Sequence, residues 1–490
     1  QCAESYYYGR GVKEDKSKAY ELYKKVADIG EADACYMVGE CYKYGYGIDE
    51  DQVKAFEWYL KAARSGIAWS QCALGLLYES GDLGKPDYKK AYMWYKESAK
   101  NGHPRGQNNL GDCYEYAKGV SKNLEEAYKW YLKSAENNDI LGQCNLGRCY
   151  EDGIGIKKDF RKAEECYIRA AERNNSWAQF RLGLLYEFND FGMPDFERAK
   201  KWYQKSADNN NPSGQLLLGE LYESGKLGKV DYEQAKIWYR KSAENGNSES
   251  QYDLGRLYAF GQIGKIDYIE AQKWWLKAAE SNNEHAQNGL GWLYECGKIG
   301  QLDYNKAFEW YSKAAENGSS RGQCNLGRCY DFAMGVKRDY IKAIGWYEKS
   351  LQSDNDNSTT MFYVGQCYEF GKGVNISSYM AYQWYKKGAD ASESDEECCF
   401  RVGEYHYAKR NPYGVVKTGA LIALSVLVPV TNAVTIPAAI LGAGANSVMS
   451  YEKFVNSDAG KEMMKYYRKA VSLGHAKAKE RVEELKKYEK

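Results

Sequence analysis

Cysteine and histidine are the side chains in this sequence that most readily bind metal ions or act as nucleophiles. The chain has 490 residues, with 14 Cys and 4 His. No Cys-x-x-Cys pair with zinc-like spacing occurs, and each His stands alone in its stretch. Most Cys recur at fixed positions of a repeated segment, as Cys113, Cys149 and Cys329 do. We therefore expect small, buried, reduced thiols and no metal site, and we expect a reducing compartment, namely the cytoplasm.

Catalytic patterns give no better candidate. The sequence has no His-Glu-x-x-His motif and no Walker phosphate-binding motif. Gly-x-Gly occurs, as in Gly153-Ile154-Gly155, but it recurs as a connector and precedes no strand pattern. Lys and Arg number 68 against 67 Asp and Glu, so the formal charge is +1 and no basic face for nucleic acid is implied. We expect a protein that is not an enzyme, needs no cofactor and does not bind nucleic acid.

The recurring Cys residues belong to a segment that the chain repeats, and this segment has the pattern of a helix. The sequence from Ala127 to Glu136 returns along the chain at steps of 36 residues, so that Trp94 and Trp130 occupy one slot. A period of this length is the signature of a solenoid built from one supersecondary unit. The residues in this slot are Leu22, Trp58, Trp94, Trp130, Cys166, Trp202, Trp238, Trp274, Trp310, Trp346 and, after a longer step, Trp384.

Each copy carries the start and stop signals of two helices. A Gly recurs in the first helix, as Gly111 and Gly147, where it costs about 1 kcal/mol against Ala. We expect that the neighbouring helix comes too close there for a Cβ. Asp or Asn, such as Asp159, precedes the second helix as an N-cap, and Gly or Asn, such as Asn138, follows it. These signals predict a helical hairpin in every copy.

The residue pattern of the repeat resembles that of a known family. The pattern Leu-Gly-x-x-Tyr, then Gly-x-Gly, then Asp-Tyr-x-Lys-Ala and Trp-Tyr-x-Lys-Ala-Ala-Glu is similar to the Sel1-like repeats, which are related to tetratricopeptide repeats. The resemblance covers residues 1–390 and continues more weakly to 490. It implies an all-α, right-handed superhelical solenoid of about twelve helix-turn-helix repeats. It also implies a scaffold or adaptor that binds protein or peptide partners, and no common reaction.

The predicted organisation has four parts. Residues 1–390 form the repeat array, whose first repeat lacks its start, and 391–410 form the first helix of the last repeat after an acidic loop. Residues 411–457 form an apolar insert, and 458–490 return to a second helix and a closing helix. The chain begins inside a repeat without Met or a signal peptide, so we expect a piece of a longer protein. An upstream catalytic domain, such as a kinase, is compatible with this reading.

The apolar insert leaves three interpretations open. It has no charged residue from Thr418 to Tyr451, and Pro429 and Pro437 bracket a turn, which predicts a helical hairpin with arms of about 11 residues. The hairpin packs on the solenoid end or on a second copy of the chain, dips into a membrane, or spans it. The predicted membrane or oligomer contacts are Leu421, Ile422, Leu424, Val426, Leu427, Ile436 and Ile440. Oligomeric state stays open.

Binding residues are expected in the variable positions of the first helix. The residues two before and one after the recurring Gly lie on one side of that helix, and their type changes between copies. Trp292 stands between Arg256 and Arg328 in successive copies, and Trp and Arg are common hot-spot residues. The sequence therefore predicts a non-enzymatic scaffold. The alternative is a membrane-associated component of protein quality control or signalling, at the endoplasmic reticulum or another membrane. The candidate partner-binding residues are Arg148, Arg181, Arg256, Trp292 and Arg328.

Overall fold

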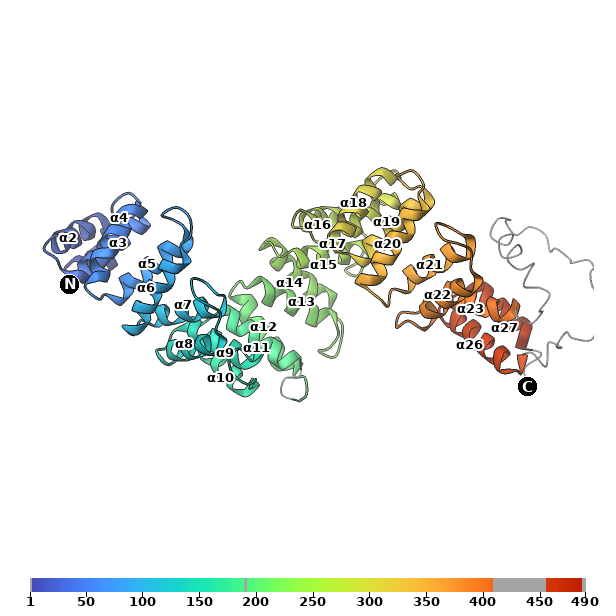
Figure 1. The fold of residues 1–490 in the computed structure, drawn as a ribbon, viewed down its shortest axis with the longest axis horizontal. Helices are drawn as coiled ribbons and strands as arrows, with labels where there is room; N and C mark the ends of the chain where they lie inside the picture. Colours follow the sequence, from blue (N-terminus) through green and yellow to red (C-terminus); the bar gives the residue numbers. More distant parts are fainter. Residues whose placement is uncertain (1, 189–191, 409–454, 487–490) are drawn as a thin grey trace, which may run out of the picture. The chain divides into compact units, whose positions relative to one another are not determined.

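The computed structural model describes residues 2–188, 192–408 and 455–486, and within these ranges it contains helices and no strand. The helices follow one another as packed pairs (Figure 1). The all-α solenoid predicted from the repeat is confirmed. The chain divides into two compact units, Gln1–Asn245 and Gly246–Lys490, which we call the N-terminal unit and the C-terminal unit. The sequence did not predict this division.

Each pair has a first helix, which carries the recurring Gly in every pair after α1–α2, and a second helix, which carries the recurring aromatic residues. The first helices are α1 (Cys2–Tyr8), α3 (Ala32–Tyr44), α5 (Ala68–Ser80), α7 (Pro104–Glu115), α9 (Ile140–Asp152), α11 (Ser176–Glu187), α13 (Pro212–Glu223), α15 (Ser248–Ala259), α17 (Glu284–Glu295), α19 (Ser320–Phe332), α21 (Ser358–Phe370) and α23 (Glu396–Ala408). The second helices are α2 (Lys16–Asp28), α4 (Gln52–Arg64), α6 (Tyr88–Lys100), α8 (Leu124–Glu136), α10 (Phe160–Glu172), α12 (Phe196–Asp208), α14 (Tyr232–Glu244), α16 (Tyr268–Glu280), α18 (Tyr304–Glu316), α20 (Tyr340–Ser353), α22 (Ser378–Asp390) and α26 (Asp458–Ser472), and α27 (Ala476–Lys486) follows the last pair.

The predicted caps set the helix limits. The Asp159 side chain accepts a hydrogen bond from the Lys162 backbone N–H at 3.1 Å, as the N-cap prediction requires. Asn138 after α8 has a φ of 59°, the left-handed conformation that ends a helix and that Asn and Gly adopt most easily. Helix α7 begins at Pro104, and His103 caps it through Nδ1, which accepts from the Gly106 N–H at 3.0 Å.

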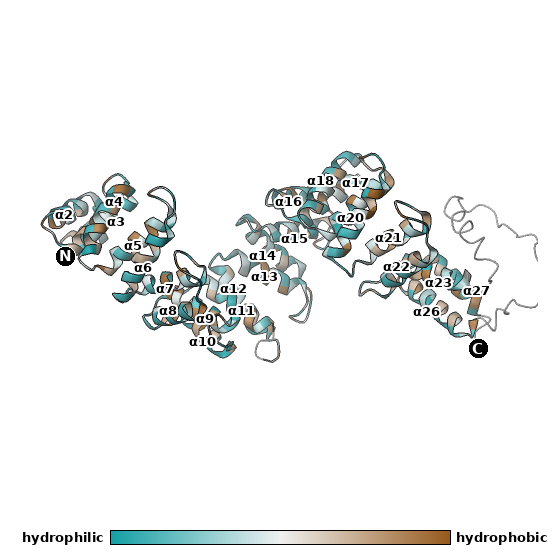
Figure 2. Ribbon diagram, viewed as in Figure 1, coloured by the Kyte–Doolittle hydropathy of each residue, from teal (hydrophilic) through white to brown (hydrophobic). Residues whose placement is uncertain are grey.

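The recurring Gly makes room for the recurring Tyr of the second helix. A Cβ on Gly147 would lie 2.5 Å from the ring of Tyr167, and Tyr167 is fully buried. The same contact joins Gly111 to Tyr131 at 2.6 Å. The close approach predicted at this Gly is therefore confirmed, and the group that approaches is an aromatic ring. Each helix carries both hydrophobic and hydrophilic residues (Figure 2), and the hydrophobic ones form the core between helices.

Within each unit, first helices of successive repeats contact one another directly. In the N-terminal unit α5 contacts α7, α7 contacts α9, and α11 contacts α13, and in the C-terminal unit α17 contacts α19. These contacts place the first helices on the tighter, inner side of each unit. Residues that vary on the first helices therefore face a shared surface, which is the arrangement that repeat proteins use for binding.

The last pair of helices packs in the same way as the preceding pairs. Helices α23 and α26 pack together, and a Cβ on Gly403 would lie 2.5 Å from the ring of Tyr467. The insert from 411 to 454, with all seven predicted membrane or oligomer contacts, lies outside the described residues. Among the helices that the structure does describe, none combines the length and the apolar character needed to cross a membrane.

Candidate partner-binding face

Three positions of each first helix form one continuous stripe. Relative to the recurring Gly they lie two before, one after and five after, and in α9 they are Asn145, Arg148 and Asp152. We call the stripes of successive helices the first-helix face. The sequence prediction used the first two positions and omitted the third.

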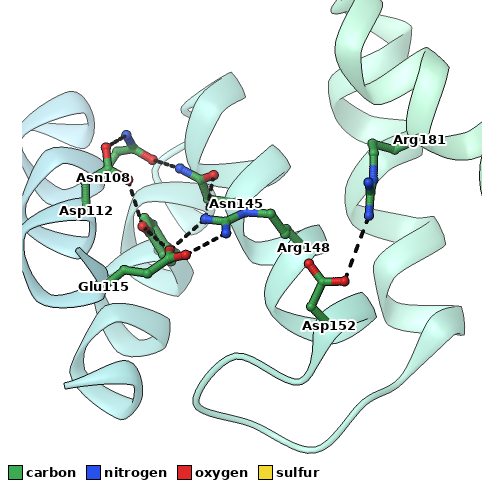
Figure 3. Close-up of polar contacts among 8 residues, drawn as sticks. Asn108, Asp112, Glu115, Asn145, Arg148, Asp152 and Arg181 are labelled. Atoms are coloured by element: carbon green, nitrogen blue, oxygen red, sulfur yellow. Dashed lines mark hydrogen bonds and ion pairs between the residues drawn. The ribbon is translucent and has the colours of Figure 1, made fainter. Parts of the chain in front are cut away.

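Arg148 is held within the protein by a neighbouring repeat (Figure 3). Its Nη1 and Nη2 donate to the two carboxylate oxygens of Glu115 at 2.6 Å each, and Glu115 also accepts from the Tyr131 hydroxyl at 2.8 Å. Only 7% of the Glu115 side chain is exposed. Burial on its own would favour the neutral acid, but the hydrogen bonds from Arg148 and Tyr131 hold the pKa of Glu115 below its ordinary value. Arg148 is therefore a structural cation as well as a candidate contact.

Amide side chains extend this network across the face. Asn145 Nδ2 donates to Asn108 Oδ1 at 2.8 Å, and the Asn145 oxygen accepts from Arg148 (Figure 3). The C-terminal unit repeats the arrangement, with Asn325 Nδ2 2.9 Å from Asn288 Oδ1 and Arg328 Nη1 2.8 Å from Asn325 Oδ1. The groups are thus preorganised by bonds to one another.

Arg181 and Arg328 have the same internal role as Arg148. Arg181 lies 2.6 Å from Glu151, and Arg328 lies 2.8 Å from Glu295. The fold therefore constrains which residues occupy these variable positions. Each cation neutralises a carboxylate that already accepts a buried Tyr hydroxyl, as Glu151 does from Tyr167 at 2.6 Å. Their part in partner binding stays a proposal.

The neutralising cation comes from different sequence positions in different repeats. Besides the two helical positions, a Lys in the following loop supplies it, as Lys118 does for Glu79 at 2.6 Å. The carboxylate is neutralised by whichever of these cations can reach it. One helical position can therefore hold Arg in one repeat and a neutral residue in the next. The remaining pairs of this type are Lys226 with Glu187, Lys372 with Asp331, and Arg401 with Glu369.

One step of the C-terminal unit replaces all three charged or polar partners. Trp275 stands where the other second helices have the buried Tyr. On the first helices, Ala259 stands at the position of the acid, and Trp292 stands at the position of the cation. Trp275 Nε1 donates to the Tyr252 carbonyl oxygen at 3.0 Å, so its polar atom remains satisfied. We call α7–α9, with Tyr131, Glu115 and Arg148, the polar step, and α15–α17 the apolar step.

Trp292 packs in this apolar step and is half-buried. Its ring centroid lies 5.9 Å from that of Phe260 and 6.0 Å from that of Tyr268. Arg256, which flanks it in sequence, pairs with Asp253 at 3.2 Å. Trp292 is therefore first a packing residue, and only the remainder of its surface is available to a partner.

The omitted third position carries exposed aromatic side chains in alternate repeats. From the second to the tenth repeat they are between 45% and 64% exposed and recur every 72 residues, which is two repeats, whereas the first repeat has Tyr8 at this position and the eleventh has Phe370. A period of two repeats is readable in the sequence once the position five after the Gly is aligned, and this signal could have found them. They are Tyr44, Tyr116, Phe188, Phe260 and Phe332.

A polar cavity lies where the repeat step lengthens. It has a volume of about 450 Å³, and Arg321, Asn325, Asp354 and Asp356 are among its lining residues. The backbone N–H of Ser392 donates to Asp356 at 3.1 Å, so the segment that follows α20 and the segment that follows α22 meet here.

The Cys and His side chains of the described residues are not arranged as a reactive site. Among the described residues, no three His, Cys, Asp or Glu side chains come together to hold a metal ion. All fourteen Cys are free thiols and twelve are buried. Burial raises the pKa of Cys149 and Cys329 to about 12, which makes them poor nucleophiles. Burial likewise lowers the pKa of His103 to about 4, so it caps α7 as a neutral ring.

One sequence match to a hydrolase motif is explained by the fold. Residues 318–322 read Gly-x-Ser-x-Gly, a pattern in which a strand must precede the serine and a helix must follow it. Here the segment joins α18 to α19, the serine of the pattern is Ser320, the first residue of α19, and the preceding Ser319 caps α19 by accepting from the Gly322 N–H at 3.1 Å. The pattern is therefore a helix connection.

The comparisons with known proteins agree with this architecture. A comparison with the sequences of curated proteins found no match. Among solved structures, the chain is similar to a protective antigen of uropathogenic Escherichia coli that displays an SLR fold, with 29% identity, a TM-score of 0.63 and coverage of 96% of this chain and 94% of that chain. It is also similar to a Sel1 repeat protein from Oxalobacter formigenes, with 32% identity, a TM-score of 0.46 and coverage of 51% of this chain and 100% of that chain.

The family model of the Sel1 repeat matches the chain in twelve segments. They are residues 1–31, 32–67, 70–103, 104–139, 140–175, 178–211, 212–247, 248–283, 284–319, 320–355, 358–393 and 464–475. The first eleven segments coincide with helical pairs, and the twelfth covers the second half of α26 and the residues that follow it. The chain belongs to the Sel1 repeat family.

Proposed function

We propose that this protein is a non-enzymatic scaffold that binds protein or peptide partners along the first-helix face. One observation carries the proposal. The inner side of each unit combines preorganised Asn and Arg side chains, such as Asn145 and Arg148, with exposed aromatic residues, such as Tyr116. Trp, Tyr and Arg dominate the energy of protein interfaces, and polar groups fixed beforehand lose little freedom on binding.

The cytoplasm fits this role. Buried free thiols, including the neighbouring Cys398 and Cys399, are typical of proteins kept in a reducing compartment. The alternative, a membrane-associated component anchored through 411–457, rests on residues outside the described ranges and stays a prediction. Carbonate extraction and detergent partition of the full chain and of a 411–457 deletion test it, and purely aqueous behaviour of both would remove it.

Affinity capture with cross-linking tests the proposed face. The full chain would be compared with two variants of equal stability. One alters the first-helix face by Asp152→Ala and Trp292→Ala, and the other alters exposed second-helix residues by Met93→Ala and Ile341→Ala. We expect partners to cross-link to the first helices and to be lost from the first variant only.

The reverse pattern would overturn the proposal. Partners that survive the first variant and disappear from the second would place binding on the second helices. Thermal unfolding of both variants is the control, because Trp292 also packs against Phe260 and Tyr268.

A further inference from the structure

The exposed aromatic residues of the first-helix face follow a period that the hairpins themselves do not have. We call Tyr44, Tyr116 and Phe188 of the N-terminal unit the aromatic row, and they are 50%, 55% and 64% exposed. Phe260 and Phe332 continue the pattern in the C-terminal unit. Ser80, Asp152, Ser224 and Cys296 occupy the same position in the repeats between them.

The packing that the hairpins share does not account for this alternation. From the second to the tenth repeat, the contact between the Gly of the first helix and the buried aromatic ring of the second helix recurs every 36 residues. A position that served only this packing would repeat at 36 residues, and the aromatic row repeats at 72. Single exposed aromatic residues are ordinary on protein surfaces, but a regular row on one face is a mark of binding.

The spacing fits an extended polypeptide. First helices of neighbouring repeats are in contact, and packed helix axes are about 10 Å apart, so successive members of the row are roughly 20 Å apart. An extended chain rises about 3.3 Å per residue, and it would cover this distance in about six residues. An α-helix would need about 13 residues for the same distance.

Polar groups between the aromatic residues favour the extended form. An extended chain presents backbone N–H and C=O groups that need partners, whereas a helix satisfies its own. Between Tyr116 and Phe188 the same stripe offers Asp152, whose side chain is 49% exposed. Asp152 lies 4.0 Å from Arg181 (Figure 3), and Arg181 already pairs with Glu151 at 2.6 Å. A carboxylate that is weakly paired at the midpoint is complementary to a basic side chain.

We infer that the aromatic row binds an extended segment of a partner protein with an apolar or aromatic residue about every six positions. In the interval between Tyr116 and Phe188 this segment carries Lys or Arg near its midpoint, opposite Asp152. The inference rests on the proposed function and specifies the partner chemistry that this face selects.

Peptide selection against the full chain tests the inference. Displayed libraries would each hold two Phe residues at a fixed separation of four to nine positions, with all other positions random. We expect enrichment at a separation of about six, with Lys or Arg midway, and binding of the selected peptide about tenfold weaker to Tyr116→Ala and Phe188→Ala than to the natural chain. Asp152→Lys should reverse the preference at the midpoint from basic to acidic.

Matched variants at the same helix position are the control. Ser80→Ala and Ser224→Ala lie in the intervening repeats, and they should leave the affinity of the selected peptide within about twofold. Unchanged thermal unfolding would show that the aromatic variants remain folded.

Several outcomes would overturn the inference. They are enrichment without a preferred separation, no enrichment at all, and selected peptides that bind the Tyr116→Ala and Phe188→Ala variant normally. If residues 411–457 occupied the row, peptide binding would appear only after that segment is deleted. If a second copy of the chain occupied it, peptide binding would appear only in the dilute monomer. Either result also overturns the inference. If captured partners still cross-link to the first helices, the proposed function stands and only the inferred partner chemistry fails.

Discussion

The polar step and the apolar step solve one packing problem in two ways. In the polar step Tyr131, Glu115 and Arg148 form a closed chain of hydrogen bonds beneath the first-helix face. In the apolar step Trp275, Ala259 and Trp292 take the same three places, and the acid and the cation disappear together. Because a buried polar group without a partner is costly, the network is kept whole in the polar step and replaced whole in the apolar step. A residue on this face is therefore interpreted together with its partners.

The largest expected effect comes from removing the cation of the polar step. Arg148→Ala leaves Glu115 charged, buried and without its ion pair, and we expect a loss of about 3 kcal/mol in local stability. Hydrogen exchange of backbone amides in α7 and α9 measures the free energy of local opening, which suits a repeat protein. Lys129→Ala, at a half-exposed ion pair of α8, is the control and should cost much less, because solvent screens that pair. Equal effects of the two would contradict the ranking.

Filling the space beside the Tyr ring is expected to have the next largest effect. In Gly111→Ala the added Cβ would lie 2.6 Å from Tyr131, whose hydroxyl is fixed by two carboxylates, and we expect a loss of about 2 kcal/mol. Gly345→Ala in α20 meets nothing within 4 Å and should instead stabilise that helix by about 1 kcal/mol. Chemical denaturation should show changes of opposite sign in the free energy of unfolding for the two variants. A stabilising Gly111→Ala would contradict this expectation.

A double-mutant cycle tests whether the acid and the cation act as a unit. Glu115→Ala and Arg148→Ala each leave a buried partner, whereas the double variant leaves neither charge unpaired. We expect the double variant to be less damaged than the sum of the single variants by about 2 kcal/mol. Hydrogen exchange of α7 and α9 again gives the values. Additive losses would mean that the step is not cooperative.

The smallest expected effect is a difference between the two steps in how their stability depends on pH. The pKa of Glu115 is lowered in the folded protein, so its ion pair stabilises fully above the ordinary carboxyl range and is lost as pH falls through the lowered pKa. The stability advantage of the natural chain over Glu115→Gln should therefore be present at pH 7 and shrink toward pH 3. The apolar step has Ala259 at that position, so Ala259→Gly should cost the same at both pH values. A constant Glu115 effect would contradict the assigned pKa direction.

The sequence predicted the fold well because its signals are local. Asp159 as a cap, Asn138 as a stop and Gly147 as a close approach each depend on a few neighbouring residues, and the structure confirms all three. The face was predicted less completely. Arg148 and Trp292 were correctly placed on the first helix, but the sequence did not reveal that Arg148 pairs with Glu115 or that Trp292 packs on Phe260. Tyr116 and Phe188 were omitted because only the two variable positions nearest the Gly were aligned.

The amino-acid sequence by itself determined the helical hairpin, its length and its repetition, since caps, breakers and an apolar stripe act within one repeat. Only the tertiary structure decided which side chains of the inner face are already engaged. Glu115 and Arg148 are 33 residues apart and meet because α7 and α9 lie side by side in the solenoid. Such a contact depends on how one repeat is stacked on the next, and the residues within one repeat do not encode that distance.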